Sequence, residues 1–158
     1  MHDIIEKHDG HILNYIGDSI MIVFGAPNEV DDHELKAVEC AIEMRKVLDE
    51  LNNEWDEVEF SRYWKNHGIN KVEARAGIHS GSVIAGNIGS DRMLQYSAIG
   101  DVVNVAARLE QSNKEFGTDI CFSHEIYINL KKDLHNNASL SGEIKLKGRS
   151  SPLKVYSI

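Results

Sequence analysis

The chain has 158 residues, of which 42% are hydrophobic and 27% are charged, so we expect one soluble globular domain spanning residues 1–158. Its net charge of −8 excludes the basic footprint of a nucleic-acid-binding protein. No apolar run approaches the roughly 20 residues that span a bilayer, and the charged start does not resemble a signal peptide. We therefore expect a cytoplasmic setting, either free or as the cytoplasmic part of a larger sensor or membrane protein.

The first residues predict a helix end followed by a hairpin. Apolar residues before Gly10 indicate a short helix that this glycine closes. Two apolar runs, residues 12–16 and 20–24, flank Gly17 and Asp18, a pattern typical of a β-hairpin. Because both runs are apolar on both faces, we expect the hairpin to lie inside a covered sheet.

A long amphipathic helix follows the hairpin. Asp31 with Glu34 three residues later resembles a capping box. Apolar residues then recur at spacings of four and three, which predicts a helix with these positions facing inward: Ala37, Ala41, Met44, Leu48 and Leu51. Residues 52–71 are polar but hold aromatic side chains, so we expect a helical extension or a packed loop. The two cysteines, Cys40 and Cys121, lie in apolar patterns and are expected to be reduced, buried thiols.

The second half of the chain predicts further strands and helices. Residues 74–79 and 82–88 read as two strands that Gly81 joins in a hairpin. Asp101 is suited to cap a helix that carries apolar residues inward. Residues 95–99 lead to Gly100, and the remaining predicted elements are a strand at 119–122, a short helix from Ser123 and two strands within 141–158. This mixture predicts an α/β fold, an α+β sandwich.

Asp18 is the first residue that could carry chemistry. A carboxylate at the tip of a tight hairpin is rigidly held at one edge, which suits a hard divalent cation. However, Gly-Asp is also a common turn dipeptide, so the pair alone favours an ordinary turn.

Asn104 and Arg108 are the next residues that could carry chemistry. They are four residues apart, so they project from one face of the predicted helix, whereas the opposite positions are apolar. The guanidinium of Arg108 presents a fork of donors that suits phosphate oxygens. Without further context, the pattern favours an ordinary surface arginine and asparagine on an amphipathic helix.

The context is a resemblance that runs over essentially the whole chain. The most specific block, residues 99–110, reads Ile-Gly-Asp-Val-Val-Asn-Val-Ala-Ala-Arg-Leu-Glu. With three other stretches in the same order, it resembles the class III adenylyl and guanylyl cyclase catalytic domain; the four stretches are Tyr15–Pro27, Arg75–Gly89, Tyr96–Glu110 and Ile144–Tyr156. The resemblance implies a ferredoxin-like mixed sheet covered by helices, of the nucleotide-cyclase type. The counterpart of the family's first strand and first helix would precede Met1, so we expect an N-terminally truncated domain.

The resemblance implies a role for each candidate residue. Two Mg²⁺ or Mn²⁺ ions bridge the triphosphate in such domains, and Asp18 matches the second of their two aspartate ligands. Asn104 matches the residue that orients the ribose, and Arg108 matches the one that stabilises the transition state. Lys147 resembles a lysine that contacts the triphosphate, although Arg149 is an alternative. The resemblance further implies a head-to-tail homodimer with each active site between the subunits.

Asn14 and Ser97 occupy the positions that read the purine in such enzymes. Ser97 resembles the threonine of some adenylyl cyclases, whereas Asn14 fits neither the adenylyl nor the guanylyl pattern and can both donate and accept hydrogen bonds. We therefore expect an adenylate cyclase that converts ATP to cyclic AMP and pyrophosphate. A guanylate cyclase acting on GTP and an inactive, nucleotide-binding regulatory domain are the alternatives.

Overall fold

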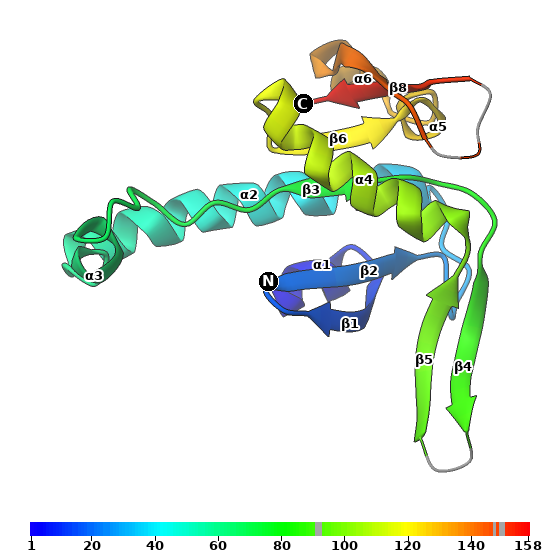
Figure 1. Ribbon diagram of the computed structural model, residues 1–158, viewed down its shortest axis with the longest axis horizontal. Coiled ribbons are helices and arrows are strands. Elements are labelled where there is room, and N and C mark those ends of the chain that lie inside the picture. Colours follow the sequence, from blue (N-terminus) through cyan, green and yellow to red (C-terminus); the bar gives the residue numbers. More distant parts are fainter. Residues whose placement is uncertain (91–92, 147, 149–150) are drawn as a thin grey trace.

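Helices and strands alternate along the chain in the computed structural model, which describes residues 1–90, 93–146, 148 and 151–158 (Figure 1). This alternation confirms the predicted α/β class. In chain order the elements are α1 (His2–Lys7), β1 (Gly10–Ile16), β2 (Ser19–Phe24), α2 (His33–Glu57), α3 (Arg62–Lys65), β3 (Ala76–Ile78), β4 (Ile84–Ser90), β5 (Met93–Ile99), α4 (Asp101–Phe116), β6 (Ile120–Ser123), α5 (His124–Tyr127), α6 (Lys132–Asn137), β7 (Ser139–Ile144) and β8 (Leu153–Ser157).

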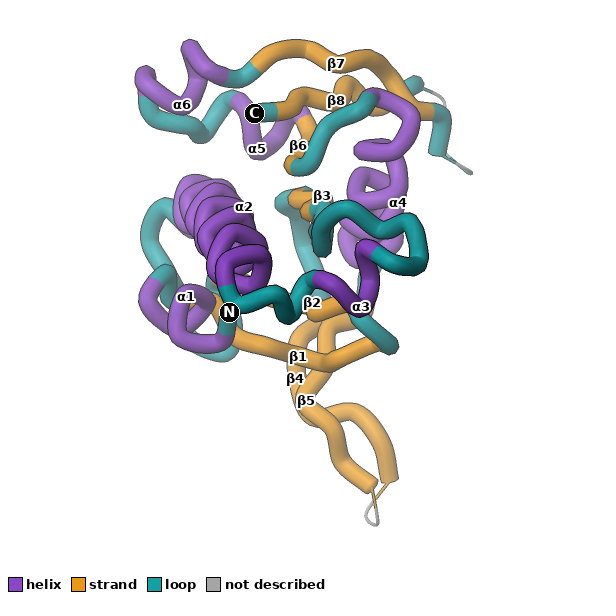
Figure 2. The backbone as a smooth tube through the Cα atoms, turned by 90° about the vertical axis from the view of Figure 1, so that its left-hand side faces the viewer, coloured by secondary structure: helices purple, strands orange, loops and turns teal. Residues whose placement is uncertain are grey.

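The main sheet is mixed and is covered by helices on both faces, as expected. Its strand order is β3-β6-β8-β7, with β3 parallel to β6 and the other pairs antiparallel. Figure 2 shows α2 and α4 on opposite sides of β3 and β6. Side chains of a strand alternate between faces, so Ile120 and Phe122 pack with Leu35 of α2. Cys121, between them, packs with Val105 of α4.

β1 and β2 form the predicted hairpin, with Gly17 in the left-handed conformation at the turn (φ 64°). The hairpin is a two-stranded sheet of its own, and one of its faces packs against α1 and α2. The expectation of a fully covered hairpin is wrong within the described residues, because Tyr15 and Ile16 at the end of β1 are 61% and 59% exposed.

The predicted hairpin between residues 74–79 and 82–88 is also wrong. β3 pairs with β6, whereas β4 pairs with β5 to form a ribbon that projects from the main sheet (Figure 1). Gly81 lies in the connection between β3 and β4, where an added Cβ would meet Val102 of α4 at 2.9 Å. Two short strands separated by a glycine do not reveal whether they pair with each other or with distant strands.

The helix ends differ from the predicted ones. α2 begins at His33, with Asp32 as its N-cap in a left-handed conformation that makes no side-chain capping bond. Glu34 does not complete a capping box, because its Oε1 accepts a hydrogen bond from Ser80 Oγ at 2.9 Å. At the end of α1, Asp9 rather than Gly10 takes the left-handed conformation (φ 58°).

α2 continues into the polar segment 52–71 as far as Glu57, and α3 follows at its far end (Figure 1). Trp55, Phe60 and Trp64 pack there with ring centroids 5.4–6.2 Å apart. Asn52 joins α2 to the returning chain, since its Nδ2 donates to Val72 O and its Oδ1 accepts from Val72 N, both at 2.9 Å.

Candidate active site

α4 carries both predicted catalytic residues, and β3 determines where this helix lies. Leu109 on the inner side of α4 is fully buried. Gly77 of β3 approaches the helix backbone so closely that an added Cβ would lie 2.1 Å from Glu110 N, which only glycine permits. Asn104 and Arg108 lie on the exposed side of the helix, as their spacing predicted.

A hollow of about 430 Å³ opens beside Asn104 and Arg108. One wall is α4 and the other is the chain that follows β7. The lining residues are Asp101, Asn104, Val105, Arg108, Lys145 and Leu146. The structure therefore brings an amide, a guanidinium and an ammonium group around one space, a donor set that suits phosphate and ribose oxygens.

The guanidinium of Arg108 is held only loosely within the chain. Its Nη1 donates to Gln111 Oε1 at 3.3 Å, and its Nη2 lies 3.7 Å from Glu115 Oε1. Charge-assisted bonds are usually 2.7–2.9 Å long, and the Arg108 side chain is 46% exposed. Its donors are thus available to an anion in the hollow.

Two residues of the hollow were missed by sequence reasoning. Asp101 was predicted only to cap the helix, but Gly100 is the N-cap and Asp101 is the first residue of α4. At that position the positive end of the helix dipole stabilises its carboxylate. Lys145 was overlooked in favour of Lys147, which lies outside the described residues, as does Arg149. The available signal was the alternation of lysines at 145 and 147 in the sequence.

Asp18 lies at the turn of the β1–β2 hairpin and is exposed. It is not among the residues that line the hollow, so the structure does not bring it together with Asn104 and Arg108 in one chain. No group of three or more His, Cys, Asp or Glu side chains among the described residues is placed to hold a metal ion. One exposed carboxylate nevertheless fits Mg²⁺, which proteins often bind through one or two carboxylates together with substrate phosphates.

Asn14 and Ser97 lie on two strands that meet. Asn14 is exposed on β1, and Ser97 is half-buried on β5. The rings of His11 on β1 and Tyr96 on β5 make an edge-to-face contact with centroids 5.5 Å apart. The two predicted base-reading positions are therefore carried by neighbouring elements of the same chain.

The model of the adenylate and guanylate cyclase catalytic domain matches residues 1–158. The chain belongs to this cyclase family. Adenylate cyclase 1 of Rhizobium meliloti (strain 1021) is 33% identical to this cyclase domain over 99% of the domain and 22% of the relative. The adenylate cyclase of Anabaena cylindrica is 30% identical over 98% of the domain and 29% of the relative. The domain thus spans less than a third of the length of these two proteins.

Solved structures agree with this assignment. The guanylyl cyclase Cya2 superimposes on the cyclase domain with a TM-score of 0.78 at 29% identity, covering 99% of this chain and 73% of that one. The adenylyl cyclase CyaB from P. aeruginosa gives a TM-score of 0.74 at 31% identity, covering 99% and 74%. The expected nucleotide-cyclase fold is therefore confirmed. In the part of the domain that the structure describes, no helix has the length and apolar character needed to cross a membrane.

Other polar and aromatic residues of the cyclase domain serve its packing. The side chain of His79 is 3% exposed, and its Nδ1 lies 2.8 Å from Ser123 Oγ, which agrees with a packed, hydrogen-bonded histidine. Trp55 and Trp64 contact each other in the cluster at the end of α2. None of these three side chains lines the hollow beside α4.

Proposed function

We propose that this domain is the catalytic domain of an adenylate cyclase, which converts ATP to 3′,5′-cyclic AMP and pyrophosphate. The hollow beside α4, with Asn104, Arg108 and Lys145 around it, is the observation that carries the proposal. The two relatives named above, both adenylate cyclases, support the same reaction.

In the proposed reaction, the ribose 3′-oxygen forms a bond to the α-phosphorus, and the bond between that phosphorus and the bridging oxygen to the β-phosphate breaks. Pyrophosphate leaves with the bonding pair, and the hydroxyl proton is released to water. Asn104 orients the ribose through its amide. Arg108 donates hydrogen bonds to the α-phosphate oxygens as charge develops on them, and Lys145 and Lys147 bind the triphosphate.

Asp18 would hold Mg²⁺ or Mn²⁺, of which two ions are expected per complete site. When bound, such ions lower the pKa of the attacking hydroxyl and neutralise developing phosphate charge. The contribution of this chain would be the Asp18 carboxylate at a tight turn, which would supply one oxygen ligand to the metal.

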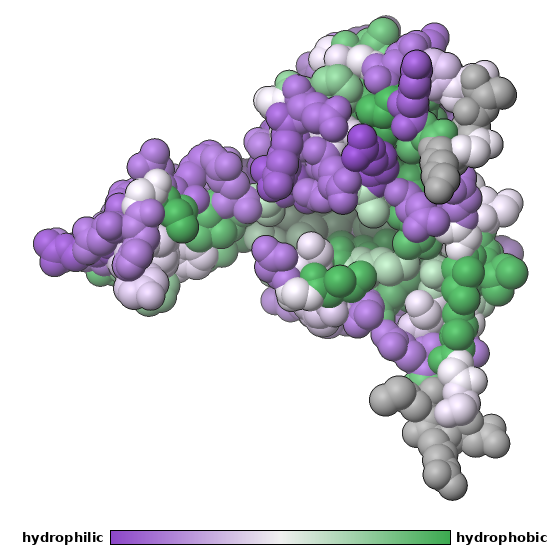
Figure 3. Space-filling model, in the orientation of Figure 1, coloured by the Kyte–Doolittle hydropathy of each residue, from purple (hydrophilic) through white to green (hydrophobic). Residues whose placement is uncertain are grey.

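We further propose that each active site forms between two copies arranged head to tail. Asp18 is absent from the lining of the hollow that contains Asn104 and Arg108, and a second copy would supply it. Exposed apolar side chains support such an assembly, since Ile84, Leu94 and Ile99 of the β4–β5 ribbon are 76%, 63% and 57% exposed. Figure 3 shows hydrophobic surface on the part of this ribbon nearest the main body and in a recess between the β1–β2 hairpin and the main sheet.

ATP is the proposed substrate because the hydroxyl of Ser97 resembles the threonine found in adenylyl enzymes. GTP is the second candidate, because Asn14 fits neither pattern and therefore does not discriminate against guanine, and because the guanylyl cyclase Cya2 has a similar structure. Offering ATP and GTP together to the full-length protein and measuring both cyclic products distinguishes the two. A protein that binds nucleotide but forms neither product would contradict both candidates and support the regulatory alternative.

Substitution of Arg108 tests the catalytic assignment. Removing one donor to a developing oxyanion commonly lowers kcat by about 10²–10³-fold, so we expect this loss in Arg108→Ala with nucleotide affinity changed only a few-fold. Arg62→Ala is the matched control, because Arg62 is exposed on α3 and pairs with Glu59. Undiminished turnover in Arg108→Ala would contradict the assignment.

Mixing two inactive variants tests the shared site. Asp18→Ala and Arg108→Ala homodimers each lack one essential residue in both sites. A mixed dimer regains one intact site of two, so equal amounts should recover about a quarter of the wild-type activity. If the residues of one site came from a single chain, mixing would recover nothing.

A further inference from the structure

β1 contains an irregularity next to one of the proposed base-reading residues. Ile12 pairs with Ile22 of β2, but the next pair joins Asn14 to Met21, so Leu13 is an extra residue in β1. Leu13 is buried, at 7% exposed. This is a β-bulge, a feature that redirects the side chains that follow it.

The bulge changes the face on which Asn14 lies. Partners in an antiparallel ladder share a face, and faces alternate along a strand. The face of Ile12 and Ile22 packs against the core of α1 and α2, and a regular β1 would place Asn14 on that face. The bulge instead places Asn14 with Met21 and His11 on the opposite face.

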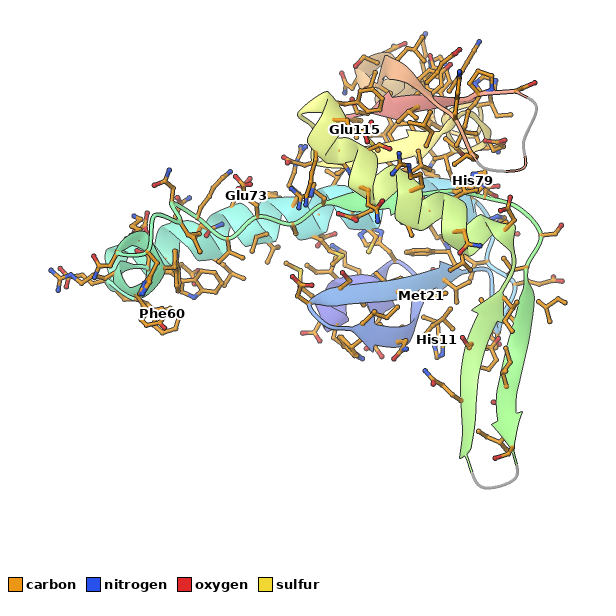
Figure 4. The ribbon with its side chains drawn as sticks, viewed as in Figure 1. His11, Met21, Phe60, Glu73, His79 and Glu115 are labelled. Carbon is orange, nitrogen blue, oxygen red and sulfur yellow. The ribbon has the colours of Figure 1, made fainter. Side chains whose placement is uncertain are left out.

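β5 contacts β1 on the side of His11. The rings of His11 and Tyr96 have centroids 5.5 Å apart and planes at 87°, and Figure 4 shows His11 beside β5. Ser97 follows Tyr96 and pairs across the ribbon with Gly86. Since Gly86 has no side chain, no cross-strand neighbour covers the Ser97 hydroxyl from that position.

We propose that the contact between His11 and Tyr96 sets the purine selectivity of this domain by fixing the strand of Asn14 relative to the strand of Ser97. Both are positioning residues, and neither is required to touch the nucleotide. The inference rests on the proposed function, because it assumes that Asn14 and Ser97 read the base. Edge-to-face aromatic contacts are directional, so their loss lets β1 and β5 shift relative to each other.

The test compares Tyr96→Phe, Tyr96→Leu and His11→Leu in the full-length protein. The readouts are the ratio of kcat/KM for ATP to that for GTP, and equilibrium binding of α,β-methylene ATP and its guanosine counterpart. Tyr96→Phe keeps the ring, so its selectivity should stay within about twofold of wild type. Tyr96→Leu and His11→Leu should each change the selectivity by about two- to tenfold, the factor that corresponds to the interaction free energy of an aromatic pair.

A double variant separates positioning from general destabilisation. If the two residues act through one contact, His11→Leu should change the selectivity little in a Tyr96→Leu background. Tyr63→Leu is the matched control. The ring of Tyr63 in α3 contacts the ring of His67 in the following turn, with centroids 5.0 Å apart. Its loss should leave the selectivity unchanged.

The outcomes distinguish this inference from the proposed function. Equal losses for ATP and GTP in the leucine variants, with unchanged selectivity in turnover and binding, would overturn the inference while the cyclase assignment stands. A wild-type protein that forms no cyclic product, but whose binding selectivity follows Tyr96 and His11 as described, would overturn only the catalytic proposal.

Discussion

Gly77→Ala is expected to displace α4 and with it the catalytic face. An added Cβ would lie 2.1 Å from Glu110 N and 2.2 Å from Ala106 O, whereas heavy atoms in ordinary contact are about 3.5 Å apart. Both are helix backbone atoms, so no side-chain rotation relieves the overlap and α4 must move by about 1 Å or more. Overpacking of this kind costs about 3 kcal/mol. Each kcal/mol lowers Tm by about 2–4 °C in a domain of this size, so we expect a fall of about 6–12 °C.

The same displacement should lower activity, because Asn104 and Arg108 lie on α4. A misplacement of about 1 Å can reduce a rate by about 10²-fold. We would measure Tm by calorimetry and cyclic nucleotide formation well below the variant's Tm. Gly86→Ala is the control for stability, since a Cβ there meets nothing within 4 Å and should change Tm by no more than about 2 °C. A Gly77→Ala protein with wild-type Tm and turnover would refute the close approach of β3 and α4.

Two further predictions concern buried polar and thiol groups. Asn52→Ala removes both hydrogen bonds to Val72, so we expect a loss of about 1–2 kcal/mol and faster hydrogen exchange at the Val72 amide; unchanged exchange there would contradict the bond. Cys40 is a free, buried thiol, as predicted, and burial raises its pKa from 9.0 to about 11. Its contribution to stability is therefore complete below pH 9 and declines as the pH rises toward 11, because the unfolded thiol ionises first. Urea midpoints from pH 8 to 10 should fall more steeply in wild type than in Cys40→Ala, and equal slopes would argue against this shift.

Several features of the site were predictable because they depend on residues close together in the chain. The hairpin turn that carries Asp18 follows from Gly17 between two apolar runs. The shared face of Asn104 and Arg108 follows from their spacing of four on an amphipathic helix. These are local or periodic properties, and the structure places both as the sequence indicated.

The wrong predictions share a physical cause. The predicted capping box does not form, because Glu34 accepts a hydrogen bond from Ser80, 46 residues away. The predicted hairpin around Gly81 does not form, because β3 pairs with β6, with Ala76 opposite Ile120. Backbone hydrogen bonds between strands use groups that nearly every residue carries, so the choice of partner leaves little mark on local sequence.

By itself, the sequence determined the α/β class and the order of most elements, because periodicity and turn chemistry act over a few residues. Its resemblance to the cyclase family indicated which residues could carry cyclase chemistry. Only the tertiary structure decided that Leu13 bulges, that Gly77 lies against α4, and that Lys145 rather than Asp18 shares the hollow with Arg108. These depend on which distant segments pack together, and that choice is made by the combined burial and hydrogen bonding of the whole chain.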